Sequence, residues 1–194
     1  MSNLILTDVD GVLLNWEYAF DTWMQTHGHR KVEGGEFKYN IGKRYNIDDD
    51  RAKQQIKYFN ESAAIGFLPP LRDAMHYVRK LHEEHGYIFH AITSLSNDEN
   101  SCKLREMNLK KLFGETVFEK FIYLDTGANK DHVLRKYRNK DLYWIEDKID
   151  NCIAGLNVNL KPLLMEHGHN MDFEHPEIPR VKNWREVYHR ILGN

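Results

Sequence analysis

The sequence predicts an α/β fold built on a parallel sheet, because short apolar runs alternate with helical patterns along most of the chain. The run Leu4–Leu6 is short, continuous and apolar, which is typical of a strand buried on both faces. Four later runs have the same character and predict further strands at 87–92, 121–124, 142–145 and 162–165. We therefore expect a sheet covered by helices on both faces.

The segments between these runs carry apolar residues at helical spacing. Leu71, Ala74, Val78 and Leu81 share one face of a predicted helix, and Gly86 is a typical helix-ending residue. Further helices are predicted at 97–112, 131–137 and 184–192.

The segment from 15 to 70 does not follow the alternation. It is rich in aromatic residues, and its one clear helical pattern, Ala52–Phe59, follows three consecutive aspartates. Pro69 and Pro70 end it. We therefore predict a core domain of residues 1–14 and 71–194, and a small helical cap of residues 15–70 inserted after the first strand.

Composition limits the classes of partner. The 27 basic and 29 acidic residues give a net charge of −2, which does not favour a broad surface for a nucleic-acid polymer or a membrane. No apolar run is long enough to span a bilayer, and the first residues lack the pattern of a signal peptide. Cys102 and Cys152 are too few for a disulfide framework. We expect a cytoplasmic protein that acts on a small molecule.

Polar residues follow three of the predicted strands directly. In chain order, these pairs are Asp8 with Asp10, Thr93 with Ser94, and Glu146 with Asp147. Ligand-binding residues of open parallel sheets gather at the carboxyl ends of the strands. Carboxylates gathered there would repel one another without a cation, and oxygen ligands favour Mg²⁺ over Zn²⁺.

The first pair lies in Thr7-Asp8-Val9-Asp10-Gly11-Val12-Leu13-Leu14, the most specific pattern in the chain. The first carboxylate could attack phosphorus, and the second could protonate the leaving oxygen and later activate water. Gly11 would allow a sharp turn close to a phosphate. The alternative is a simple turn after a strand, since Asp and Gly are common turn residues.

These residues resemble four motifs of the haloacid dehalogenase (HAD) superfamily, in order along nearly the whole chain. Asp-x-Asp-Gly-Val-Leu from Asp8 resembles motif I, Ile92-Thr93-Ser94 motif II, and Lys130 the lysine of motif III. The segment from 144 to 151, which contains the Glu146-Asp147 pair, resembles motif IV. The resemblance implies a Rossmann-like HAD core and a magnesium-dependent phosphohydrolase that works through an aspartyl-phosphate.

The resemblance also implies individual roles. Asp8 would be the nucleophile and Asp10 the general acid and base, while Thr93, Ser94 and Lys130 would bind the phosphoryl group. Asp8, the backbone carbonyl of Asp10, and Asp147 would hold Mg²⁺. Glu146 departs from the commoner Asp-Asp or Gly-Asp form, so we favour Asp147 as the direct ligand and Glu146 as a partner outside the ligand set.

Several of these residues have a simpler interpretation. Thr93 and Ser94 could cap the following helix. Lys130 could be a solvated residue at a helix start. Asn129 and Lys140 are poorer candidates for the position of the motif III lysine. Asp150 could orient a metal-bound water or cap a helix, and the sequence favours neither.

Within the superfamily, the 5'(3')-deoxyribonucleotidase group is the most similar. Residues 67–74 (Phe-Leu-Pro-Pro-Leu-Arg-Asp-Ala) resemble its junction between cap and core, and residues 180–187 resemble its C-terminal Asn-Trp helix start. Two segments depart from the group: Glu166-His167-Gly168-His169-Asn170, and the cap residues from Gly28 to Arg51. The resemblance implies a nucleoside 5'-monophosphate, with a deoxyribonucleotide favoured.

Aromatic residues of the cap could stack on a nucleobase. Trp16 and Phe67 flank the expected hinges and are the predicted substrate-facing pair, whereas Phe20 and Trp23 share a helix face and are predicted to pack. His167 and His169 are predicted to be loop residues and not metal ligands. Two other functions remain open: a HAD phosphatase for another small phosphate, such as a sugar phosphate, and a non-catalytic binding module.

Overall fold

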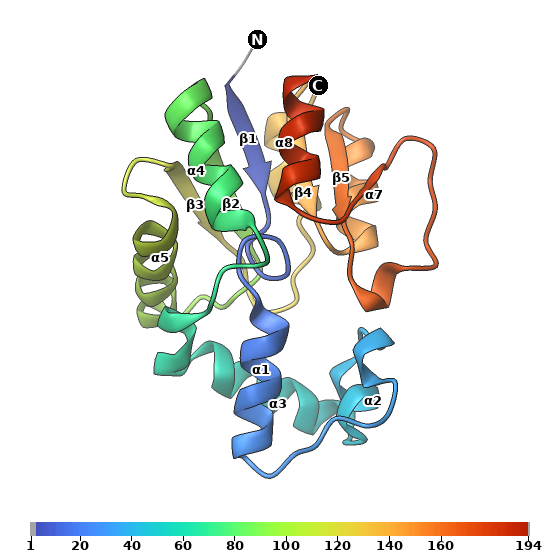
Figure 1. Cartoon of the computed structure of the whole chain (residues 1–194). Helices are drawn as coiled ribbons and strands as arrows, with labels where there is room; N and C mark the ends of the chain where they lie inside the picture. The colour runs from blue at the N-terminus through green and yellow to red at the C-terminus, as the bar shows by residue number, and fades with distance from the viewer. Residues whose placement is uncertain (1–2, 194) are drawn as a thin grey trace.

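The structure is a computed structural model that describes residues 3–193. Its centre is a six-stranded parallel sheet in the order β3-β2-β1-β4-β5-β6 (Figure 1). The strands are β1 (Leu4–Thr7), β2 (Ile88–Thr93), β3 (Phe118–Tyr123), β4 (Tyr143–Glu146), β5 (Lys161–Met165) and β6 (Arg180–Val181). The α-helices are α1 (Trp16–Thr26), α2 (Ile41–Tyr45), α3 (Asp49–Asn60), α4 (Ala74–His85), α5 (Glu99–Phe113), α6 (Asp131–Leu134), α7 (Ile149–Leu156) and α8 (Trp184–Leu192). Short 3₁₀ turns are η1 (Gly35–Phe37), η2 (Ala63–Phe67), η3 (Arg135–Tyr137) and η4 (Gly168–Asn170).

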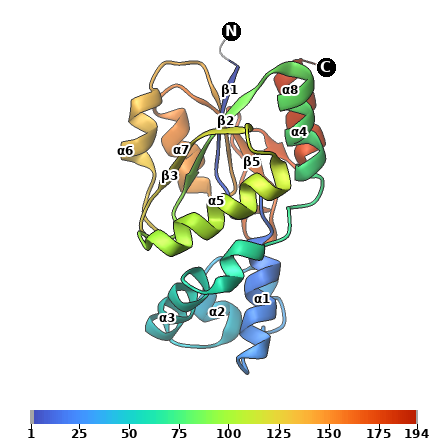
Figure 2. The ribbon, with the colours of Figure 1, turned by 90° about the vertical axis from the view of Figure 1, so that its left-hand side faces the viewer.

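The predicted parallel α/β class is confirmed. Helices α4 and α8 lie on one face of the sheet, and α6 and α7 lie on the other (Figure 2). Ile5 and Leu6 are both fully buried although successive side chains of a strand point to opposite faces. Ile5 packs in the cluster that contains α4 and α8, and Leu6 packs in the cluster of α6 and α7. The apolar run of β1 is therefore buried on both faces of the sheet, as its sequence predicted.

The two sheet edges differ most from the prediction. Strand β3 begins at Phe118, three residues before the predicted start, and its Glu119 and Lys120 are exposed. An edge strand can carry such polar residues, so its apolar pattern is incomplete. Strand β6 has two residues and was not predicted as a strand, because so short a pairing leaves no periodic pattern.

The segment from 15 to 70 folds as the helices α1, α2 and α3 with η1 and η2. It lies beyond the carboxyl ends of the strands (Figure 1). Its two connections run side by side, since the Asn15 amide donates to the carbonyl of Pro69 at 2.9 Å and the Leu71 amide donates to the carbonyl of Leu13 at 2.8 Å. This pairing fixes where the segment leaves the sheet and where it returns.

Helix α8 ties the end of the chain to the turn after β1. The Asp73 carboxylate accepts from the backbone amides of Trp184 at 2.9 Å and Arg185 at 3.1 Å. The buried indole of Trp184 donates to the carbonyl of Val12 at 2.8 Å. Two segments that the sequence analysis singled out, 67–74 and 180–187, therefore meet beside the loop that carries Asp8 and Asp10.

Among residues 3–193, no helix combines the length and apolar character that crossing a membrane requires.

Candidate active site

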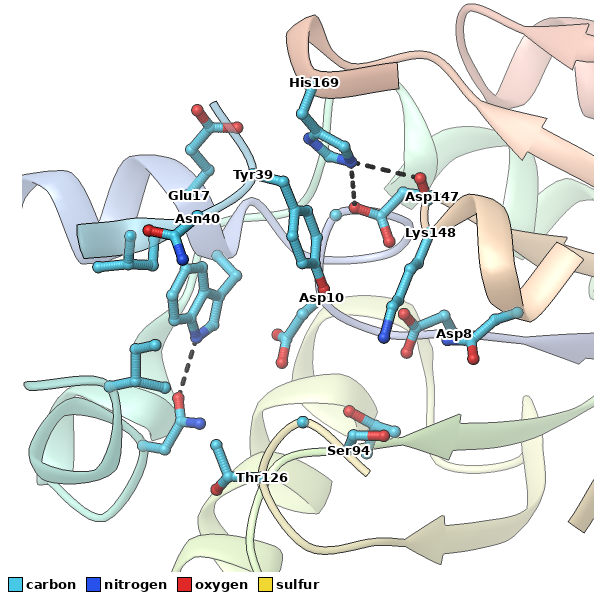
Figure 3. A pocket seen from close by; sticks show the side chains of 18 of the residues that line it. Asp8, Asp10, Glu17, Tyr39, Asn40, Ser94, Thr126, Asp147, Lys148 and His169 are labelled. Carbon is cyan, nitrogen blue, oxygen red and sulfur yellow. Dashed lines mark hydrogen bonds and ion pairs between the residues drawn. The ribbon is translucent and has the colours of Figure 1, made fainter. Parts of the chain in front are cut away.

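The carboxyl ends of β1, β2 and β4 open onto a cavity of about 480 Å³. Its walls come from the sheet and from the 15–70 segment (Figure 3). Small-molecule pockets have volumes of roughly 300–1,000 Å³, so the cavity is of suitable size. The predicted site residues that line it are Asp8, Asp10, Trp16, Thr93, Ser94, Lys130, Glu146 and Asp147.

Asp8 lies at the end of β1, at the floor of the cavity. Its Oδ1 accepts from the Val9 amide at 2.7 Å and forms an ion pair with Lys130 Nζ, also at 2.7 Å. Burial raises the pKa of Asp8 well above its ordinary value, and the carboxylate of Glu146 raises it further, against the opposing effect of Lys130. The carboxylate is therefore held in place, but its ionised form needs more positive charge than Lys130 alone supplies.

Lys130 and Glu146 form a buried pair behind Asp8. Lys130 Nζ lies 2.8 Å from Glu146 Oε2, and neither side chain is more than 2% exposed. Burial lowers the pKa of Lys130, but Asp8 and Glu146 outweigh it and raise the pKa above its ordinary value. For Glu146, burial alone would raise the pKa, but Lys130 together with hydrogen bonds involving Asp8 and Asp147 outweighs burial, and the net pKa is lowered. Both members of this pair therefore carry their charges.

The remaining hydrogen bonds of Glu146 bear on the choice of metal ligand. Its Oε1 accepts from the backbone amides of Asp147 at 3.0 Å and Lys148 at 3.1 Å, and its Oε2 also accepts from Asn151 Nδ2 at 3.0 Å. Each oxygen therefore has two protein donors. The Glu146 carboxylate shapes the loop after β4, and Asp147 is the freer carboxylate of the pair.

Three carboxylates here could hold a cation. One oxygen each of Asp8, Glu146 and Asp147 lies within 4.8 Å of the others. Burial raises the pKa of Asp147 well above its ordinary value, as do the charges of Glu146 and Asp8. A bound divalent cation would relieve this repulsion, and an all-oxygen donor set suits Mg²⁺. The site thus fits the predicted metal by its chemistry.

Gly11 is required where the chain turns past this cluster. Its φ is +75°, and a Cβ at this position would lie 2.5 Å from Asp147 Oδ2. A side chain there would therefore collide with the carboxylate that is predicted to bind the metal.

Thr93 and Ser94 end β2 at the cavity wall. Thr93 Oγ1 is buried and has no hydrogen-bond partner within residues 3–193, whereas Ser94 Oγ donates to the carbonyl of Ala128 at 2.8 Å. The cap of helix α5 is Asp98, which accepts from the Ser101 amide at 2.8 Å, so the helix-cap alternative for Thr93 and Ser94 does not hold. An unpaired buried hydroxyl at a cavity wall suits a phosphoryl oxygen as its partner.

Asp10 lies on the turn after β1, two residues beyond Asp8. Its carboxylate is partly exposed to the cavity and forms an ion pair with Arg105 of α5. Sequence reasoning did not assign Arg105. The available signal was an arginine on the helix face that also carries Leu109 and Phe113, because a charge in a buried stripe needs a partner.

Of the two predicted substrate-facing aromatics, the structure brings one to the cavity. Trp16 lines it, with its indole stacked on Phe20 at 4.5 Å between ring centroids and its Nε1 donating to Asn60 Oδ1 at 3.0 Å. Phe67 does not line the cavity, and 67% of it is exposed at the end of η2. Its prediction as a substrate contact is therefore corrected. Phe20 is fully buried, as expected of a packing residue.

Known proteins with a similar sequence or structure indicate the fold to which this geometry belongs. No model of a protein family matches the sequence. An uncharacterized 32.4 kDa protein of Enterobacteria phage T4 is 25% identical to the chain, over all of this chain and 71% of its own length. Among solved structures, CbbY from Rhodobacter sphaeroides, in complex with phosphate, aligns with a TM-score of 0.62 at 16% identity, over 96% of each chain.

Two more solved structures agree. The haloacid dehalogenase-like family protein SP0104 from Streptococcus pneumoniae has a TM-score of 0.63 at 13% identity, over 98% of each chain. L-2-haloacid dehalogenase from Xanthobacter autotrophicus has a TM-score of 0.63 at 8% identity, over 100% of this chain and 99% of its own. The chain has the Rossmann-like HAD fold of these structures. The predicted fold is therefore confirmed, but none of these proteins is described as a nucleotidase.

In this HAD fold, the loop after β5 joins the core to the 15–70 segment. His167 Nε2 donates to the carbonyl of Gly11 at 2.6 Å, and the ring of His169 lies 5.1 Å from that of Tyr39. A Cβ on Gly168 would lie 2.5 Å from the carbonyl oxygen of Glu36, so this glycine permits close contact with the segment. The sequence analysis noted the two histidines only as loop residues and did not assign Tyr39, which lines the cavity (Figure 3).

Asp150 lies apart from these residues. It is exposed in the first turn of α7, whose N-cap is Lys148, and it does not line the cavity. The HAD fold therefore places it neither at the cavity nor at the cap position itself. Its acidic charge instead suits the N-terminal end of the helix dipole.

The lowered pKa of His167 predicts how the stability of the protein depends on pH. Burial lowers the pKa of its imidazole to about 4, whereas an unfolded histidine titrates near 6.5. Between these values the unfolded chain binds a proton that the folded chain does not, so stability falls as the pH decreases through this window. Between pH 6.5 and pH 4.5, we expect the free energy of unfolding of the wild type to fall by about 2 kcal/mol more than that of His167→Gln.

Urea unfolding of both proteins at several pH values measures this difference. A stability gap between wild type and variant that stays constant over the window would contradict the prediction, since His167 would then titrate alike in the folded and unfolded states.

Proposed function

We propose that this chain is a magnesium-dependent phosphomonoester hydrolase that forms an aspartyl-phosphate on Asp8. The observation that carries the proposal is the position of Asp8 on the cavity floor, within 4.8 Å of two further carboxylates and 2.7 Å from a buried lysine. Bound Mg²⁺ would supply charge neutralisation for the phosphoryl group and the nucleophile. Asp8, Asp147 and the backbone carbonyl of Asp10 would hold it.

The proposed reaction has two steps. A carboxylate oxygen of Asp8 attacks phosphorus, and the bond from phosphorus to the ester oxygen breaks while Asp10 gives its proton to that oxygen. A water molecule then attacks the same phosphorus and passes a proton to Asp10, and the Asp8–phosphorus bond breaks to release inorganic phosphate. Lys130 and the hydroxyl group of Thr93 would bind the phosphoryl oxygens throughout, and the Ser94 hydroxyl would join them by turning from the Ala128 carbonyl.

We further propose nucleoside 5'-monophosphates as the substrates. One face of Trp16 is covered by Phe20, and the Asn60 hydrogen bond prevents the indole from turning. Because Trp16 also lines the cavity, it would present a rigid aromatic surface to a planar base. The second candidate is a sugar phosphate, which is favoured by the similarity to CbbY, whose D10N mutant was solved with xylulose-1,5-bisphosphate.

A substrate panel tests the proposal. Nucleoside 5'-monophosphates, sugar phosphates and p-nitrophenyl phosphate are each incubated with Mg²⁺ and with EDTA, and released phosphate is measured. The highest kcat/KM on a nucleotide, lost in EDTA, is expected. Faster turnover of sugar phosphates than of every nucleotide would overturn the substrate assignment alone. No turnover of any ester would overturn the phosphatase and leave a binding module.

Trp16→Ala tests base stacking directly. Stacking on an aromatic side chain contributes about 1–3 kcal/mol per base, so KM for a nucleotide should rise by roughly tenfold or more. KM for p-nitrophenyl phosphate should change far less, and Trp16→Phe should keep most of the nucleotide affinity. Phe67→Ala is the matched control, because Phe67 is an aromatic residue outside the cavity. Equal losses on both esters would show that Trp16 serves packing and not recognition.

Asp147→Asn tests the choice of metal ligand. A neutral amide is a poorer ligand for Mg²⁺, so the magnesium concentration for half-maximal activity should rise about tenfold or more, with a smaller change in substrate KM. Glu146→Gln should mainly lower thermal stability, because Glu146 is buried against Lys130. If Glu146→Gln raised the magnesium requirement and Asp147→Asn did not, the two acids would have the opposite roles.

A further inference from the structure

Arg105 is a fully buried arginine that reaches the cavity-lining carboxylate of Asp10. Its Nη1 donates to Asp10 Oδ1, and the two residues lie 95 positions apart in the chain. It comes from α5, whose buried face also carries Leu109 and Phe113. Within residues 3–193, Arg105 is the basic side chain that forms an ion pair with Asp10.

The contact is poorly explained by stability. Nε and Nη2 of Arg105 are buried and have no hydrogen-bond partner among the described residues. Leaving a buried donor unpaired destabilises a protein, and more so when the group is charged. An apolar side chain of similar length would pack on this face without that cost. What Arg105 provides in return is its single bond to Asp10.

Helix α5 is firmly placed relative to the loop that carries Asp10. Asn108, one turn beyond Arg105, donates from Nδ2 to the carbonyl of Leu68 at 3.0 Å, on the connection that returns from the 15–70 segment. That connection is itself bonded to the end of the loop, through the Leu71 amide and the carbonyl of Leu13. The distance that Arg105 must span to Asp10 is therefore set by the fold.

Lys130, the buried basic group beside Asp8, does not take this role. Lys130 Nζ is bonded to Asp8 and Glu146 at 2.7 and 2.8 Å. The Asp10 side chain is 24% exposed, so on the cavity side it has room to turn. Without Arg105, its carboxylate would be free to sample orientations in which it does not face the ester oxygen.

We propose that Arg105 is a positioning residue that holds the Asp10 carboxylate in the orientation required for proton transfer to the leaving group. The inference rests on the proposed function, since it assigns Arg105 a part in that reaction. A general acid must lie within about 2.6–3.2 Å of the atom it protonates, and a misplacement of 1 Å can cost on the order of 10²-fold in rate. Arg105 itself does not line the cavity, so it would act through Asp10 and not by contact with the substrate.

The test compares leaving groups. An alkoxide needs a proton as it leaves, whereas p-nitrophenolate is a much weaker base and leaves without one. We expect Arg105→Met to lower kcat/KM for an alkyl monoester, or for the best nucleotide of the panel, by about 30-fold or more. It should lower kcat/KM for p-nitrophenyl phosphate by less than about threefold. Arg105→Lys should recover part of the alkyl-ester rate.

Arg79→Met is the matched control, because Arg79 of α4 donates to the carbonyl of Leu112 and lies outside the cavity. It should leave both rates near the wild-type values. The variants are also made in an Asp10→Asn background, where Arg105→Met should cause no further loss on the alkyl ester. This comparison separates positioning of Asp10 from a general effect on folding.

The outcomes separate the two proposals. Equal losses on both esters, or a further loss in the Asp10→Asn background, would overturn the role of Arg105 while the phosphatase proposal stands. A wild-type protein that hydrolyses neither ester with Mg²⁺ would overturn the phosphatase proposal, and the role of Arg105 with it.

Discussion

Asp8→Asn is expected to abolish phosphatase turnover while leaving the fold intact. The change removes the charge of the attacking oxygen but keeps the shape of the side chain, which directly follows β1. Because the loss of a nucleophile removes the covalent step, kcat should fall on the order of 10⁴-fold or more. Phosphate release from the best substrate of the panel measures the effect, and circular dichroism and thermal unfolding check the fold.

The same variant gives a second readout. Rapid acid quenching after incubation with ³²P-labelled substrate should trap labelled wild-type protein and no labelled variant. Deamidation of the new asparagine must be excluded by mass spectrometry. Turnover at the wild-type rate by an intact asparagine variant would reject Asp8 as the nucleophile.

Lys130→Met should have the largest effect on stability. Lys130 lies 2.7 Å from Asp8 and 2.8 Å from Glu146, and it is 2% exposed. Its removal leaves three carboxylates within 4.8 Å of one another without their buried cation. Breaking a buried ion pair costs about 3–5 kcal/mol. For a chain of this size the loss corresponds to a fall in Tm of roughly 6 to 20 °C.

Magnesium should restore part of the lost stability, since a cation among the carboxylates would reduce their repulsion. Phosphatase activity should not return, because the lysine would also bind the phosphoryl group. Lys140→Met is the control for Lys130→Met, because Lys140 is exposed near the start of β4 and was the alternative lysine in the sequence. A Tm equal to that of the wild type in Lys130→Met would contradict the buried pairing.

The parts of the fold and site that the sequence predicted are those coded by local pattern. The apolar run Leu4–Leu6 followed by Asp8 predicts a buried strand and a polar strand end from neighbouring residues alone. Parallel strands then bring their carboxyl ends to one edge, so Thr93, Glu146 and Asp147 come to the same cavity as Asp8. Patterns at the sheet edges are weaker, which is why β3 began early and β6 was missed.

Which carboxylate of the Glu146-Asp147 pair is free to bind a cation depends on hydrogen bonds that no sequence pattern shows. Glu146 and Asp147 are adjacent in sequence and chemically alike. Only the fold reveals that Glu146 accepts hydrogen bonds from Lys130, Asn151 and two backbone amides, which leaves Asp147 as the freer carboxylate.

The sequence by itself determined the sheet, the order of the strand-end residues and the chemistry they favour, because burial of apolar runs and strand alternation act over a few neighbouring residues. Tertiary structure alone decided that Phe67 points to solvent, that Arg105 meets Asp10, and that His167 reaches Gly11. The last two contacts join residues 95 and 156 positions apart. Their geometry depends on which helix face and which loop pack together, and that is set by the whole core at once.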